Sequence, residues 1–116
     1  MRPVAVEGVV DHMAVTGVRG GMSSTVVKFT EAGVVVEDGE FVGEFDASAV
    51  VSEELAHRLA SWYDEVSYLV SVRSGGEAMA YFVSREDFNR VDVGCGIRFS
   101  VLRFRAASIR VIEILE

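Results

Sequence analysis

The sequence contains few of the residues that would indicate a particular scaffold or chemistry. It has one cysteine, Cys95, and one proline, Pro3, among 116 residues. A single cysteine excludes an internal disulfide and a zinc site built from several thiolates. Scarce proline, together with 22 valines, favours strands joined by short turns. A chain of this length can bury a core without such crosslinks, so we expect one domain over residues 1–116.

Long apolar runs are also missing. No stretch approaches the roughly 18 apolar residues that suggest a membrane span. The opening residues MRPVAVEGVV include one arginine but neither a continuous apolar segment nor a small-residue cleavage site, so we expect no signal peptide. These features lead us to expect a cytoplasmic protein with no membrane partner.

Positive charge is scarce and unevenly placed. The net charge is −7, and residues 1–65 hold 4 basic and 12 acidic side chains while residues 66–116 hold 7 and 6. An acidic chain is poorly suited to non-specific binding of nucleic acid, which needs a basic surface. The uneven distribution suits a subunit that docks on another protein.

Motifs for catalysis are absent as well. No GxSxG, P-loop, HExxH or GxGxxG pattern occurs. His12 and His57 belong to no spaced motif, and Cys95 lies between two glycines with no base nearby to activate it as a nucleophile. We therefore expect a protein that is not an enzyme, with no catalytic residue, cofactor or metal ligand.

One segment has clear helical periodicity, and we expect an amphipathic helix over residues 52–65. Leu55, Leu59, Trp62 and Val66 recur on one helical face. Ser52 is placed to cap its N-terminus. The remaining chain has the short alternating patterns of strands, so the fold class is mainly β (α+β). We expect strands over residues 4–15, 25–30, 34–37, 40–45, 67–73, 78–84, 97–105 and 108–115.

Several details of this prediction concern particular positions. Gly8 within the first strand indicates a bulge or a close backbone approach. A bulge near Val101 would explain a shift in the alternation of the strand over 97–105. Residues 17–23 (GVRGGMS) are expected to form a flexible turn, and residues 85–88 a single helical turn. A helix over residues 8–18 is the alternative to the first strand.

Two charged groups could form surfaces. The acidic group lies around residues 31–46, and we interpret it either as a solvated face or as a docking face for a basic partner. Its members are Glu31, Glu37, Asp38, Glu40, Glu44 and Asp46. The basic group is the arginine stripe, Arg98, Arg103, Arg105 and Arg110. These arginines either pair with acids such as Glu113 or bind nucleic acid or protein.

The order of segments resembles a known family. The segments are VEGVVDHM, STVVKF, VGEFDASAVV, DEVSYLVSV, AMAYFVSRED, IRFSVLRF and SIRVIEIL. In this order and apolar pattern the chain is similar to the small OB-fold subunit of archaeal and eukaryotic RNA polymerases, often called subunit eight. The resemblance implies a small OB-like Greek-key β-barrel with one helix. It also implies a non-catalytic subunit of a multisubunit complex that docks through protein–protein contacts.

Other functions stay open at this point. A stand-alone OB module could bind single-stranded nucleic acid through the arginine stripe, and a salt-dependent affinity for oligonucleotides would distinguish it. If residues 8–18 form a helix, the order of elements is similar to that of a sliding-clamp half domain with two helices on a sheet. The composition also permits a viral accessory protein.

Overall fold

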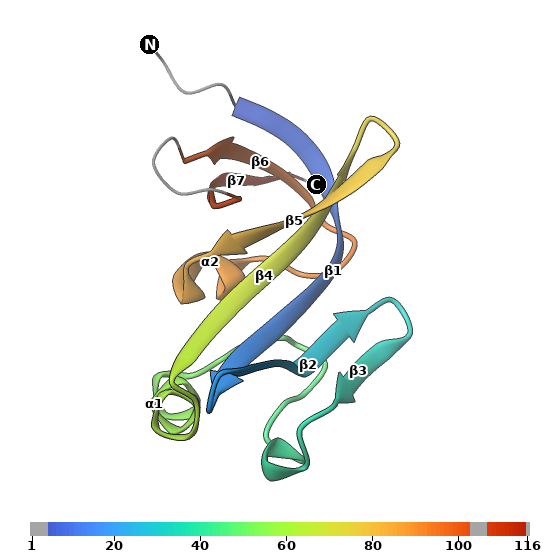
Figure 1. Cartoon of the computed structure of the whole chain (residues 1–116). Coiled ribbons are helices and arrows are strands. Elements are labelled where there is room, and N and C mark those ends of the chain that lie inside the picture. The colour runs from blue at the N-terminus through green and yellow to red at the C-terminus, as the bar shows by residue number, and fades with distance from the viewer. Residues whose placement is uncertain (1–4, 103–106, 116) are drawn as a thin grey trace.

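The computed structural model describes residues 5–102 and 107–115, and these residues form a mainly β fold (Figure 1). The strands are β1 (Ala5–Arg19), β2 (Met22–Thr30), β3 (Gly33–Val36), β4 (Glu65–Ser74), β5 (Glu77–Val83), β6 (Gly96–Val101) and β7 (Ile109–Leu115). The helices are a 3-10 turn η1 (Gly39–Phe41), α1 (Glu53–Trp62) and α2 (Arg85–Arg90). The predicted mainly β class is confirmed.

The strands belong to one open antiparallel sheet. Five of them follow in the order β3-β2-β1-β4-β5, while β6 pairs with β1 and β7 pairs with β6. β3 pairs with β2 alone, so it forms an edge of the sheet. At the opposite side, one isolated parallel bridge joins Phe82 of β5 to Ser108, just before β7. The sheet is therefore not closed by continuous pairing.

β1 is the central strand and changes partner along its length. It pairs with β4 from Val9 to Val18 along one edge; along the other it pairs with β6 near its start and with β2 near its end. A Cβ on Gly8 would lie 2.5 Å from Cγ1 of Val72 and 2.8 Å from the carbonyl oxygen of Arg73. The close approach expected at Gly8 is confirmed, and the register shift lies nearby, at Asp11.

Several predictions for the first strand were wrong at its ends. β1 continues to Arg19 instead of ending at residue 15, and the turn expected over 17–23 contains only Gly20 and Gly21, with φ of +59° and +79°. The alternative helix over 8–18 is wrong, and the sliding-clamp arrangement that depended on it is wrong too. The valines of β1 lie in mid-sheet, where Val10 and Val15 are buried.

α1 begins where the sequence predicts and ends earlier. The Ser52 hydroxyl accepts a hydrogen bond from the Leu55 N–H at 3.1 Å, and Leu55 and Leu59 are buried. Tyr63 then takes an extended conformation, φ −103° and ψ 147°, which ends the helix. The last residues of the predicted helix over 52–65 are therefore outside α1, and Val66 lies in β4.

The strand predicted over residues 40–45 was also wrong. Asp38 accepts a hydrogen bond from the Glu40 N–H and starts η1, which buries Phe41 against the Tyr63 ring at a centroid distance of 6.0 Å. The bulge predicted near Val101 lies instead opposite the Arg98–Phe99 step, where β7 contributes the extra residue. Residues 103–105 of the strand predicted over 97–105 lie outside the described residues.

α2 is the helical turn predicted over residues 85–88, extended to Arg90, and it joins distant parts of the chain. Phe88 is fully buried, with its ring 6.1 Å from Phe29 of β2 and 5.4 Å from Tyr68 of β4. The Asn89 amide accepts from the Val51 N–H at 2.8 Å and donates to the Val51 carbonyl at 2.9 Å. Within the described part of the chain, no helix is both long and apolar enough to cross a membrane.

Candidate functional site

The arginine stripe is only partly described, and its first member is held by acids. Arg98 on β6 forms ion pairs with Glu113 of β7 at 2.6 Å and with Glu7 of β1 at 3.8 Å. Two carboxylates therefore balance its charge, as the ion-pair interpretation of the stripe expects. Such half-exposed pairs contribute little to stability, but they reduce the positive charge available to a phosphate.

The other arginines do not extend this surface among the described residues. Arg110 is exposed on β7, opposite Ser100, and lines a shallow pocket of about 280 Å³ that also touches Phe82. Arg103 and Arg105 lie outside the described residues. The structure therefore places two of the four arginines, Arg98 and Arg110, on neighbouring strands. Of these two, Arg98 forms ion pairs with carboxylates.

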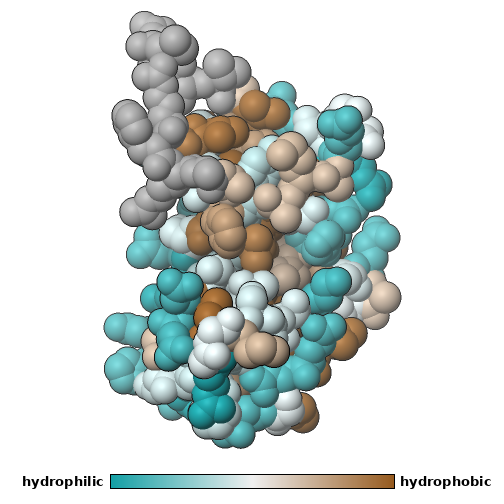
Figure 2. Space-filling view, viewed as in Figure 1, coloured by the Kyte–Doolittle hydropathy of each residue, from teal (hydrophilic) through white to brown (hydrophobic). Residues whose placement is uncertain are grey.

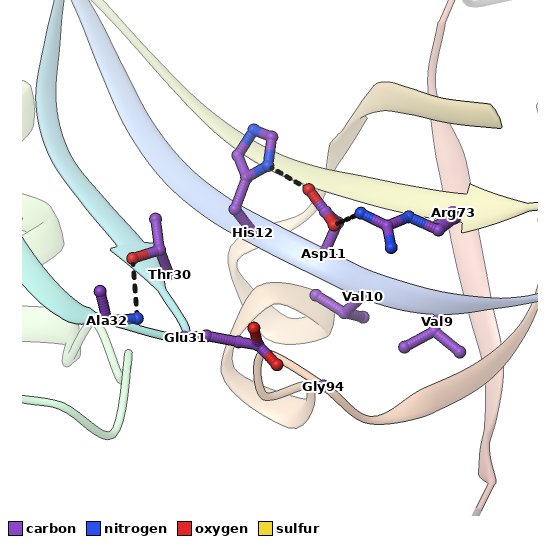
Figure 3. A pocket seen from close by; sticks show the side chains of 9 residues that line it. All are labelled: Val9, Val10, Asp11, His12, Thr30, Glu31, Ala32, Arg73 and Gly94. Atoms are coloured by element: carbon purple, nitrogen blue, oxygen red, sulfur yellow. Dashed lines mark hydrogen bonds and ion pairs between the residues drawn. The ribbon is translucent and has the colours of Figure 1, made fainter. Parts of the chain in front are cut away.

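A larger pocket, of about 530 Å³, lies where β1 changes partner from β2 to β6. Figure 3 shows Asp11 between His12 and Arg73, bonded to both. The His12 Nδ1 lies 3.0 Å from Asp11 Oδ2. This hydrogen bond, with help from the Arg73 charge, holds the pKa of Asp11 below its ordinary value.

Four polar side chains of this pocket, Asp11, His12, Thr30 and Arg73, already have partners within the protein. Asp11 and Arg73 neutralise each other, and the Thr30 hydroxyl accepts a hydrogen bond from the Ala32 N–H at 3.2 Å within its own turn (Figure 3). No nucleophile is paired with a base there. In the part of the chain that the structure describes, no group of three or more His, Cys, Asp or Glu side chains could hold a metal ion. The pocket was not foreseen, because it lies where β1 changes partner, and that change depends on strands distant in sequence.

Negative charge is concentrated in one continuous part of the chain. Residues 22–62, which we call the acidic segment, run from β2 to the end of α1 and connect β1 to β4. They hold 2 basic and 8 acidic side chains, a net charge of −6 out of −7 for the whole chain. In Figure 2 hydrophilic side chains dominate the region around α1, while apolar ones gather nearer to β5 and β6.

Most of these acids are exposed and lack a cationic partner among the described residues. Glu44 pairs with Arg58 at 2.5 Å. No other ion pair within the described ranges involves the acidic segment. Its exposed acids are Glu31, Glu37, Glu40, Glu44, Asp46, Glu53 and Glu54. Their negative field therefore extends into solvent, where it can attract a cationic partner.

Tyr63 connects the acidic segment to the rest of the fold. The Tyr63 hydroxyl donates to the Asp38 carboxylate, and burial together with this hydrogen bond raises the pKa of Tyr63 to about 12. The Tyr63 ring also packs on β1, since a Cβ on Gly17 would lie 2.4 Å from it. The acids are thus displayed on a fixed scaffold, which lowers the entropic cost of binding.

Comparison of the chain with protein-family models, with characterised proteins and with solved structures identified no match. Its fold and surface define a mainly β domain with one strongly acidic segment. The function of this chain is therefore inferred from its own geometry and charge.

Proposed function

We propose that this chain is a non-catalytic binding module that docks on a larger assembly through its acidic segment. The observation that carries the proposal is the concentration of charge: net −6 within residues 22–62, on a folded scaffold. A surface of this kind favours a partner protein with a basic face and repels nucleic acid. The absence of a paired nucleophile and base in the described pocket agrees with a binding role.

The strand connections support an OB-like barrel as the scaffold of this module. Pairing runs from β1 to β4 and β5, crosses the parallel Phe82–Ser108 bridge to β7, and returns through β6 to β1. The segment containing α2 lies between β5 and β6, and α2 packs against β7 near the gap left by the bridge. We propose that these five strands form an incompletely closed OB-like barrel.

In this arrangement the acidic segment replaces the connection between the first and second barrel strands. OB modules that bind oligonucleotides use this connection as a binding loop. A net charge of −6 there opposes contact with phosphates, and Arg98 is already paired with Glu113 and Glu7. The stand-alone nucleic-acid module is therefore the weaker candidate. A multisubunit complex, with RNA polymerase as one candidate suggested by the order of segments, is the better partner.

The proposal can be tested with the whole tagged chain in extract of its source organism at physiological salt. We expect a protein retained in near-stoichiometric amount, identified by mass spectrometry, and large polymerase subunits would identify the complex. Replacing Glu31, Glu37 and Glu40 by Gln should release that protein. A matched variant, with Gln at Glu65, Glu77 and Glu86, changes the same charge outside the acidic segment and should retain it.

Two results would contradict the proposal. One is retention of the partner by both Gln variants alike, which would exclude the acidic segment as the docking surface. The other is the absence of any retained protein combined with tight, salt-dependent binding of a single-stranded oligonucleotide by the purified chain. That second result would instead support the arginine stripe as a nucleic-acid surface.

A further inference from the structure

The outer edge of β3 offers backbone groups that no described residue bonds. β3 is the last strand on its side of the sheet and pairs only with β2. The Glu37 N–H donates to the Val26 carbonyl at 2.8 Å, so the backbone N–H of Glu37 points toward β2. In an antiparallel strand the backbone groups of successive residues point alternately toward the paired strand and away from it. The N–H and C=O groups of Val34 and Val36 therefore point away from β2. No hydrogen bond within the described ranges reaches these outward groups.

The side chains of β3 divide between the core and the solvent. Val34 and Val36 pack against the hydrophobic core. Val35 is 56% exposed and lies opposite Lys28 of β2. An added strand would therefore find a fixed backbone template and an apolar contact beside it.

Charge decides which occupant fits this edge. Glu31 precedes β3 in its turn, Glu37 follows its last residue, and Glu40 lies in η1; all three are exposed. A second copy of the chain would bring the same acids against these acids, and like charges across an interface are strongly unfavourable. Nucleic acid is disfavoured for the same reason. A segment bearing lysine or arginine is complementary.

We propose that β3 binds an extended, basic segment of a partner protein as an added strand. The partner's backbone bonds the outward groups of Val34 and Val36, an apolar partner side chain covers Val35, and basic side chains pair with the flanking glutamates. The β2–β3 hairpin is preformed, so its own ordering costs little on binding. This inference rests on the proposed function and specifies where docking occurs and by which chemistry.

The test uses the purified full chain and a short synthetic peptide of alternating lysine and valine. We expect binding that weakens with added salt, together with slower hydrogen exchange at the amides of Val34 and Val36. V36P removes one outward N–H without touching a bond to β2, and it should weaken binding about tenfold, the effect of one lost hydrogen bond. E37K should weaken binding as well, while E77K, the same charge change on the remote β4–β5 hairpin, should leave it unchanged.

Three results would overturn the inference: no binding of the peptide, binding that leaves exchange at Val34 and Val36 unchanged, or protection of these amides by self-association without peptide. V36P also separates this inference from the proposed function. If the variant retains the cellular partner as strongly as the unmodified chain does, docking occurs elsewhere on the acidic segment and only the strand-addition inference fails. If the unmodified chain retains no partner and instead binds a single-stranded oligonucleotide tightly, the proposed function itself fails.

Discussion

Two edge strands of the sheet, β7 and β3, differ in what bonds their outer backbone groups. On β7, the Val111 N–H donates to Asp87 Oδ2 at 2.9 Å and the Val111 carbonyl accepts from Arg90 at 3.2 Å, both from α2. On β3, the corresponding groups of Val34 and Val36 have no bond within the described residues. One edge is satisfied by side chains, and the other is left open.

The difference follows from burial. Val111 is 3% exposed and Asp87 is 8% exposed, so an unpaired backbone group there would lose water without gaining a partner. On β3, Val34 and Val36 are only half-buried and Val35 is 56% exposed, so the outward groups lie closer to water. Its flanking glutamates also protect it from pairing with another copy. The comparison indicates that α2 completes the fold, whereas the β3 edge is available for a partner.

The largest effect that tests this contrast is expected at Val111. V111P removes the N–H that Asp87 accepts, leaves that buried carboxylate short of a donor, and disturbs a buried side chain. The bonds between β7 and β6 are not directly removed, because this N–H points toward α2. We expect a loss of about 4 kcal/mol in the free energy of unfolding, measured by urea denaturation.

Two further variants separate packing from hydrogen bonding. V111A keeps the N–H and loses only packing, at a cost of about 2 kcal/mol. D87A removes the acceptor and should cost about 3 kcal/mol. If the hydrogen bond is the shared cause, V111P and D87A together should cost less than their sum. Fully additive costs would show that the two residues act independently.

Local patterns were enough to predict the parts of the fold that local chemistry decides. Ser52 starts α1 because its hydroxyl satisfies a helix N–H, which the sequence displays directly. Gly75 and Gly76 mark the β4–β5 turn, with φ of +60° and +86°, because glycine tolerates such angles. The mainly β class follows in the same way from alternating valines.

Features that depend on distant partners were missed. Phe41 and Phe45 alternate with acids as in a strand, yet residues 39–41 form a 3-10 turn because Phe41 packs under Tyr63. β1 extends to Arg19 because β2 and β4 both pair with its last residues. The open edge of β3 could not be predicted either, since it depends on which strands find neighbours. The candidate site is therefore visible in sequence only as a run of acids.

A smaller effect should show how the β3 side is held in place. The pKa of Tyr63 is raised to about 12 by burial and by its bond to Asp38, which follows β3. The neutral hydroxyl is favoured in the folded state, so its stabilising contribution is complete below pH 10 and falls as the pH rises toward 12. A rise in the pKa from 10.0 to about 12 corresponds to roughly 3 kcal/mol.

Chemical denaturation at pH values between 9 and 12 would measure this dependence, with Y63F as the comparison. Y63F should be less stable at neutral pH and should lose less stability across this range. D38N leaves Tyr63 buried but removes the acceptor's charge, so its free energy of unfolding should fall with pH to an intermediate extent. An equal fall with pH in the unmodified chain and in Y63F would contradict the role assigned to this hydroxyl.

The smallest effect on stability is expected at β3 itself. V36P removes an outward N–H that has no bonding partner, whereas V111P removes an outward N–H that is bonded to Asp87. Comparing the two proline variants therefore compares the two edges directly. Edge strands accept proline where the N–H faces solvent, and we expect V36P to cost less than about 1 kcal/mol in urea denaturation. V35P serves as the internal control, because the Val35 N–H faces β2 and its loss should cost about 3 kcal/mol. If V36P instead destabilises the chain as much as V111P, the outer edge of β3 is not free. The basis for an added partner strand would then be gone, even though the acidic segment could still attract a basic protein.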